Sequence, residues 1–311
     1  MTTTTITDAS RQEDARRRAR LLKIATTASV ATASLLVAAK LAVWLLTGSV
    51  SLLASLVDSI MDVMASGVNL LAVRWALAPP DEEHRFGHGK AESLAGLGQA
   101  AFIAGSALFL MFQAADRFVN PRPLEHLGIG IAVMLFSMVA TVLLIGLQRF
   151  VIARTGSVAI RADSLHYVSD LLTNAGILVA LGLALGGWLW ADAVIGLAVA
   201  VYIFWSALRI GIDAVQMLMD RELPEGEQAQ ILAIATRLPE VVGAHDLRTR
   251  QAGPVRFIQL HLELPAEQPL RLAHAISERV AAELRAAFPG ADVIIHQDPA
   301  MEDDPADSNS R

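Results

Sequence analysis

The chain has 311 residues, 54% of them hydrophobic, and a mean hydropathy of +0.47. A composition this apolar excludes an ordinary soluble domain and indicates a membrane protein with several spans and one small soluble domain. The net charge of −6, with no basic patch beyond the N-terminus, argues against a nucleic-acid partner. There is no cysteine, so disulfides are excluded and any metal site must use histidines and carboxylates.

The N-terminal segment, residues 1–22, is polar and contains the basic run Arg16–Arg20, and we expect it to be a mobile arm. The apolar run that follows has no cleavage signal and is longer than that of a signal peptide, so we expect a retained helix. Six apolar segments in all, each near the ~20 residues that a bilayer requires, predict a six-helix transmembrane domain over residues 23–213. They lie at about 24–46, 50–77, 93–116, 126–148, 159–185 and 189–211.

Basic residues are distributed unevenly between the two sides of these spans. The connections after the second and fourth spans share a side with the N-terminal arm, and they carry Arg85, Lys90, Arg149 and Arg154. The opposite connections carry Arg117 and Arg122 in one, and no basic residue in the other. Because basic residues collect on the cytoplasmic side, both termini are predicted to be cytoplasmic.

The second and fifth spans each carry two metal-type ligands four residues apart: Asp58 with Asp62, and His166 with Asp170. At helical pitch, each pair lies on one face, one turn apart. Both pairs are about a dozen residues from a helix end, which is roughly 18 Å and close to the midplane of a ~30 Å hydrocarbon core. Transporters hold their substrates at this depth. If the two faces meet, they supply three carboxylates and an imidazole, enough for a tetrahedral transport site.

A polar patch that only joins helices is the alternative explanation of these four residues. Ionisable residues inside a membrane are costly, and they usually mark a functional site. No Lys or Arg lies between the two residues of either pair to neutralise them, which argues against a salt-bridged patch. Lys40 in the first span is expected to extend toward the outer interface.

A second group of candidate ligands lies in the connection after the second span: Asp81, His84 and His88. These three side chains could converge on one metal ion. An exposed loop with Gly87 and Gly89 would form a loose site, and a solvated loop without an ion explains the same residues. The sequence leaves both explanations open.

After residue 220 the pattern becomes that of a soluble domain. It predicts a helix at 225–238, strands at 241–250 and 255–264 around the turn Gln251–Pro254, a helix at 270–288 and a strand at 292–297. The fold class is therefore an α-helical membrane protein with six transmembrane helices, followed by a cytoplasmic α+β domain of order αββαβ over residues 221–299. The acidic tail, residues 300–311, is expected to be disordered.

Histidines are concentrated in this C-terminal domain. Four of the eight histidines of the chain, and one carboxylate at the end of the domain, are candidate metal ligands: His245, His261, His274, His296 and Asp298. Alternation along the predicted strands places His261 on a polar face, and places His296 and Asp298 on one face. One histidine alone would more often be structural, whereas four within one small domain indicate a cytosolic metal site. His126 is assigned no role.

Five motifs between about Lys23 and Pro299 resemble those of the cation diffusion facilitator family. They are Gly48-Ser49-Val50-Ser51, Leu56-Val57-Asp58-Ser59, His84-x-Phe86-Gly87-His88-Gly89-Lys90-Ala91-Glu92, Arg161-Ala162-Asp163-x-Leu165-His166-Tyr167 and Val293-Ile294-Ile295-His296-Gln297-Asp298-Pro299. The resemblance implies a transport site at the four ligands of the second and fifth spans and a second site in the loop. It also implies a binuclear site at the five C-terminal ligands, with Gln297 adjacent. It further implies a metallochaperone-like C-terminal domain, a homodimer, and a lysine–aspartate interlock between Lys90 and Asp220.

The function expected from these observations is efflux of a divalent cation across the inner membrane by proton antiport, without enzymatic activity. Oxygen ligands with one imidazole suit Zn²⁺, with Fe²⁺ and Cd²⁺ as further substrates. Zinc would also bind the cytoplasmic sites and regulate transport. A membrane-anchored sensor or storage protein, which binds metal without moving it, is the alternative. An intramembrane metalloprotease is a weaker alternative, because the sequence contains no His-Glu-x-x-His.

Overall fold

The computed structural model describes residues 2–47, 50–119, 128–185, 188 and 190–300, and every structural statement below concerns these residues. The expected disorder of residues 300–311 falls almost entirely outside them, as does His126. The chain divides into two compact units, each considered by itself. One comprises Arg17–Leu218, and the other contains the segment from Met219 onward together with the start of the first helix up to Arg16.

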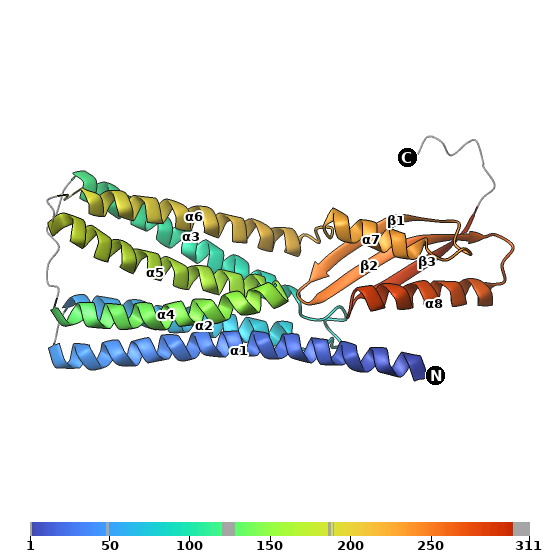
Figure 1. Ribbon diagram of the computed structural model, residues 1–311, viewed down its shortest axis with the longest axis horizontal. Coiled ribbons are helices and arrows are strands. Elements are labelled where there is room, and N and C mark those ends of the chain that lie inside the picture. The colour runs from blue at the N-terminus through green and yellow to red at the C-terminus, as the bar shows by residue number, and fades with distance from the viewer. Residues whose placement is uncertain (1, 48–49, 120–127, 186–187, 189, 301–311) are drawn as a thin grey trace. The chain divides into compact units, whose positions relative to one another are not determined.

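The first unit consists of long helices (Figure 1). They are α1 (Thr2–Thr47), α2 (Val50–Ala76), α3 (Lys90–Val119), α4 (Gly128–Thr155), α5 (Val158–Leu185) and α6 (Ala191–Leu218). Among the residues that the structure describes, five helices are long and apolar enough to cross a membrane, namely all but α5. A helical membrane region is therefore confirmed, and α5 as a sixth span stays a prediction.

Several helices extend beyond the apolar segments that predict them. The expected mobile arm is instead helical, because α1 begins at Thr2 and continues without a break into the first span. Its Ala, Arg and Glu residues are good helix formers, and they extend a helix that the span has already nucleated. Likewise α4 continues to Thr155 and α6 to Leu218. Hydropathy identifies only the part of a helix that faces lipid, whereas the hydrogen-bonded helix extends beyond that part.

Helix α5 is the central packing element of this unit, since it contacts α2, α3, α4 and α6. Helices α3 and α6 form the most extensive pair, with small buried residues such as Ala100 and Ala207 in their shared core. A Cβ on Gly211 would lie 3.7 Å from that of Ala100, which shows how closely the two backbones approach. Small residues allow such close packing between helices in a membrane.

The second unit has the predicted αββαβ order. Its elements are α7 (Glu225–Ala235), β1 (Gly243–Ala252), β2 (Val255–Pro265), α8 (Leu270–Ala287) and β3 (Asp292–Ala300). The sheet has the order β1-β2-β3, with β2 antiparallel to β1 and parallel to β3. The turn between β1 and β2 is the predicted one, and Gly253 adopts the positive φ of +56° that it requires.

The two helices of this unit pack against one face of the sheet (Figure 1). Alternate residues of β2, including Ile258, Leu260 and Leu262, are buried there with Ile231 of α7 and Leu284 of α8. The intervening residues of β2, which include His261 and Glu263, lie on the opposite face. The candidate metal ligands of β2 are therefore on the face away from the helices.

Candidate metal sites

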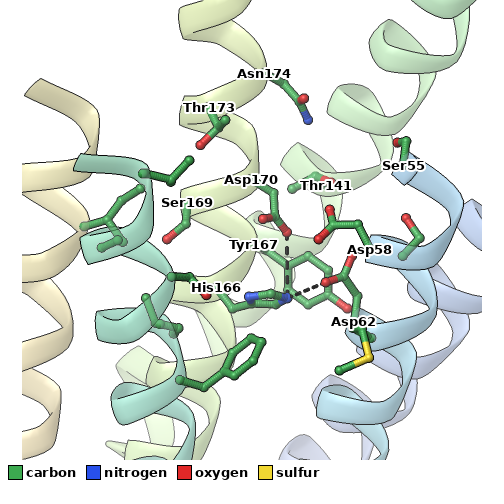
Figure 2. Close-up of a pocket in the computed structure, with 18 of the residues that line it drawn as sticks. Ser55, Asp58, Asp62, Thr141, His166, Tyr167, Ser169, Asp170, Thr173 and Asn174 are labelled. Atoms are coloured by element: carbon green, nitrogen blue, oxygen red, sulfur yellow. Dashed lines mark hydrogen bonds and ion pairs between the residues drawn. The ribbon is translucent and has the colours of Figure 1, made fainter. Parts of the chain in front are cut away.

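Three of the four residues predicted for the transmembrane site come together in the structure (Figure 2). Nε2 of His166 lies 2.8 Å from Oδ1 of Asp62 and 3.8 Å from Oδ2 of Asp170. One ligand atom from each residue lies within 4.8 Å of the others. Ligand atoms in a tetrahedral zinc site are roughly 3.3 Å apart, given metal–ligand distances of about 2.0–2.1 Å. A small displacement would therefore let all three coordinate one ion.

Asp58, the fourth predicted ligand, lines the same cavity but lies outside this close group. Its side chain is exposed and has no hydrogen-bond or ion-pair partner within the described part of the chain. Figure 2 shows it on the side of the cavity that carries Asp62, across from α5. Asp58 is thus free to approach an ion held by the other three.

The cavity around these ligands has a volume of about 690 Å³ and is lined by residues from all six helices. Its polar lining beyond the ligands includes Ser55, Thr141, Thr173 and Asn174 (Figure 2). Ser55 lies near the start of α2, and Asn174 lies one turn beyond Asp170. The polar lining therefore leads from the ligands toward the end of the unit at which α1 ends and α2 begins.

A buried hydrogen-bond network lies on the other side of His166, and it centres on Asp163, which is 0% exposed. Its carboxylate accepts hydrogen bonds from Ser29 Oγ at 2.6 Å, Gln148 Nε2 at 2.8 Å, Gln99 Nε2 at 3.2 Å and Ser66 Oγ at 3.5 Å. These donors belong to α1, α4, α3 and α2, so five helices meet at one carboxylate of α5. Asp163 was not among the predicted functional residues, although a charged residue in an apolar segment, one turn before His166, was a signal for it.

Tyr167 extends this network beside the ligands. Its hydroxyl lies 2.9 Å from Ser66 Oγ and donates to the backbone carbonyl of Ser29 at 3.2 Å. The side chain is 1% exposed. Together with Asp163, Tyr167 fills the space between α5 and helices α1 and α2 on the side of the ligands opposite to the polar lining.

Lys40 differs from its expected position. Its ammonium donates to Ser59 Oγ at 2.6 Å and to the backbone carbonyl of Ser55 at 3.2 Å, and the residue lines the ligand cavity. The expectation that Lys40 extends to the outer interface is wrong, because acceptors on α2 satisfy the ammonium within the helical unit. A cation therefore does accompany the acidic ligands, and it comes from a helix other than theirs.

The loop ligands also converge. Asp81 lies 3.3 Å from Nδ1 of His84 through one oxygen and 3.2 Å from Nε2 of His88 through the other. The backbone N–H of His84 donates to the Asp81 carboxylate at 2.6 Å, which lowers the pKa of Asp81 below its usual value. Gly87 has a φ of +78°, a conformation that favours glycine, so the turn brings His88 back toward Asp81 without strain.

The cytoplasmic ligands form two adjacent rows across the sheet. His245, His261 and His296 are direct neighbours on β1, β2 and β3. In the next row, Gly243, Glu263 and Asp298 are neighbours. The Asp298 carboxylate lies 2.7 Å from His261 Nδ1, 3.3 Å from His245 Nε2 and 3.2 Å from His296 Nε2. The hydrogen bond from His261 holds the pKa of Asp298 below its usual value, so the carboxylate is available as a ligand.

Two carboxylates beside this cluster were not predicted. Oε1 of Glu263 lies 3.0 Å from His245 Nδ1, on the ring side away from Asp298. A Cβ on Gly243 would lie only 2.6 Å from the other Glu263 oxygen, so glycine makes room for this carboxylate. Asp246, with a φ of +44°, lies 3.7 Å from His261 Nε2 at an irregularity of β1. The alternation of residues along β2 could have identified Glu263, which lies on the same face as His261. The position of Asp246 depends on the irregularity of β1.

The remaining predicted residues are not in this cluster. His274 lies on the exposed side of α8 and belongs to no metal-type group among the residues described. Lys90 donates to the carbonyl of Leu218, and Asp220 pairs with Arg250. Lys90 and Asp220 belong to different units, and the implied interlock stays a prediction.

Comparison with protein families connects these clusters to a known class of protein. Residues 26–219 match the model of the cation efflux transmembrane domain, and residues 223–300 match that of the cation efflux protein cytoplasmic domain. The chain belongs to the cation efflux family. It is therefore a multi-pass membrane transporter of metal cations and not an enzyme.

Close relatives in this family are named cation-efflux pump FieF. The relative from Citrobacter koseri is 53% identical over 280 residues, which cover 90% of this chain and 93% of the relative. One from Klebsiella pneumoniae is 53% identical over 281 residues, with 90% and 94% covered. The metal-bound C-terminal domain of the CzcD transporter from Thermotoga maritima is 26% identical over 25% of this chain and 94% of that one. Its TM-score is 0.23, and that likeness carries no argument here.

Proposed function

We propose that this cation efflux protein exports Zn²⁺ from the cytoplasm in exchange for protons, with Fe²⁺ and Cd²⁺ as further substrates. The observation that carries the proposal is the group formed by Asp62, His166 and Asp170 in a cavity of a membrane-spanning unit. Two carboxylates, an imidazole and a nearby third carboxylate suit a four-coordinate Zn²⁺.

The ligand chemistry supports proton exchange. Carboxylates and imidazole bind a metal only when deprotonated, so metal and protons compete for the same atoms. An ion that enters from the cytoplasm displaces protons, and protons that arrive from outside displace the ion. The inward proton gradient then drives export.

The proposed topology has six spans within residues 23–213, with α5 as the fifth, and cytoplasmic termini. The basic connections described above support this orientation. In that orientation, the polar lining that runs toward the α1–α2 turn leads outward, and the network at Asp163 and Tyr167 closes the cytoplasmic side. The described conformation would then be one that releases metal.

The cytoplasmic domain, residues 221–299, is proposed to bind zinc at its sheet face and to regulate transport in a homodimer. The two rows of ligands across the sheet support metal binding there, and the loop group at Asp81 supports a further site.

The test is zinc entry into proteoliposomes that hold a metal-sensitive dye, for the wild type, Asp170→Ala and Asp213→Ala. Asp213 pairs with Arg161 outside the cavity, so its replacement is the matched control. We expect entry in the wild type and the control, and none with Asp170→Ala. Tight binding without entry in the wild type would instead support a membrane-anchored sensor or store.

A further inference from the structure

Lys40 is the one lysine or arginine that lines the ligand cavity, as far as the structure describes it. It comes from α1, within a segment apolar enough to span the membrane. A charged side chain in such a segment is costly and is retained where it has a function. No carboxylate of the described residues lies at ion-pair distance from its ammonium.

The two acceptors of Lys40 fix its ammonium to the helix that carries two of the ligands. Ser55 and Ser59 flank Asp58 on α2, and both hydrogen bonds join α1 to that stretch. Lys40 lies seven residues before the end of α1, and Ser55 lies seven residues before Asp62. The ammonium is therefore on the side of the ligands toward the α1–α2 turn, which is the side to which the polar lining leads.

We propose that Lys40 is a specificity-determining and release residue, whose fixed charge weakens divalent metal binding in this conformation and speeds the departure of the ion. This inference rests on the proposed function. Two positive charges in a partly dehydrated cavity repel each other far more strongly than in water. A divalent ion is repelled twice as strongly as a single proton, so the ammonium favours replacement of the metal when one proton takes its place.

Replacement of Lys40 tests this role, because loss of the charge should strengthen binding while slowing turnover. In the full-length protein, Lys40→Met is expected to bind Zn²⁺ about tenfold more tightly at the transmembrane group and to lower the maximal flux by a similar factor. Binding is measured with His88→Ala and Asp298→Ala in the background, so that the loop and cytoplasmic clusters do not contribute. Lys40→Arg, which keeps the charge, should restore wild-type values.

The matched control is Lys23→Met, the same substitution in an exposed position of α1 that does not line the cavity. A Lys40→Met protein that binds Zn²⁺ as the wild type does, or more weakly, would overturn the inference, because a merely structural tie between α1 and α2 predicts weaker binding. Unchanged flux would overturn it as well. If the wild type itself moves no zinc, the proposed function fails, whereas tighter binding in Lys40→Met would still be measurable and would support the repulsion.

Discussion

Asp298 places one carboxylate against the imidazoles of three strands, and the side chains around it decide which ring nitrogen faces a metal. Glu263 lies 3.0 Å from His245 Nδ1, so the other nitrogen of that ring, Nε2, faces Asp298. Carboxylates that hold the outer nitrogen of a ligand histidine fix its orientation and its tautomer. Gly243 allows this, because any larger residue would meet the Glu263 carboxylate.

Glu263→Gln should therefore weaken zinc binding at the cytoplasmic cluster by about 10- to 100-fold, as replacement of such supporting groups generally does. Binding is measured by titration calorimetry in the full-length protein with His88→Ala and Asp170→Ala, which disable the other two groups. Glu278→Gln on α8 is the control, since Glu278 lies outside the cluster. Equal affinities for both variants would show that Glu263 does not support the site.

The lowered pKa of Asp298 predicts a pH-dependent contribution to stability. A carboxylate with a depressed pKa in the folded state stabilises the fold above its unfolded value of about 3.9, and this contribution is lost as the pH falls through the folded pKa. The midpoint temperatures of unfolding of the wild type and Asp298→Asn should thus differ by a constant interval above about pH 5. This interval should shrink below about pH 4. An interval that widens in acid would contradict the stated cause.

The sequence predicts residues whose partners lie within one helix turn or one strand, and it misses those whose partners lie on other elements. The four-residue spacing of His166 and Asp170 predicts that the two lie on one face of a helix, and in the structure both line the same cavity. Asp163 and Lys40 depend on which helices become neighbours, and a hydropathy pattern does not contain that information. Asp246 depends on the irregularity of β1, which exists only when β1 and β2 pair.

Among the elements, α5 carries two of the four candidate ligands of the cavity, and α3 approaches closely at the start of this helix. A Cβ on Gly96 would lie 2.9 Å from a methyl group of Val158, the first residue of α5. The glycine thus sets the distance between the two helices near their cytoplasmic ends in the proposed topology.

Gly96→Ala should destabilise the helical unit by about 1–2 kcal/mol, because the added methyl group overpacks this contact. Gly98→Ala is the matched control, since nothing lies within 4 Å of its added Cβ. In the double variant with Val158→Ala the two costs should partly cancel, because the contacting methyl is gone. Thermal unfolding in detergent is measured for the wild type, the two glycine variants, Val158→Ala and the double variant, and additive costs would contradict the contact.

Asp163 links five helices through its hydrogen bonds, so its replacement should destabilise the whole helical unit. Asp163→Ala leaves the donors from Ser29, Gln99 and Gln148 without their acceptor in a buried site, at a cost on the order of 3 kcal/mol. Asp213→Ala removes a half-exposed ion pair worth about 0–1 kcal/mol. The midpoint of thermal unfolding should therefore fall much further for Asp163→Ala, and equal shifts would exclude the network as a structural centre.

At this scale, the predicted order of helices and strands agrees with the structure, while the helix ends differ. The strands at β1, β2 and β3 were expected within a few residues of their observed bounds, because turn residues such as Gly253 mark them. The long N-terminal extension of α1 was not expected, because a polar sequence does not indicate whether the helix of a neighbouring span continues into it.

For the whole molecule, the family assignment and the ligand geometry lead to one account. In the account that we propose, a cation held by Asp62, His166 and Asp170 would leave through the polar side of the cavity when protons replace it, aided by the charge of Lys40. The cytoplasmic cluster would then report how much metal remains inside. Coupling between metal and protons is the central claim, and flux of metal alone does not establish it.

The most direct test records metal and pH in the same proteoliposomes, with one dye for zinc and one for protons in the lumen. With an acidic lumen and zinc outside, wild-type vesicles should gain zinc while the luminal pH rises in step. Vesicles with Asp170→Ala should show neither change. Zinc entry in the wild type with no movement of protons would contradict the account.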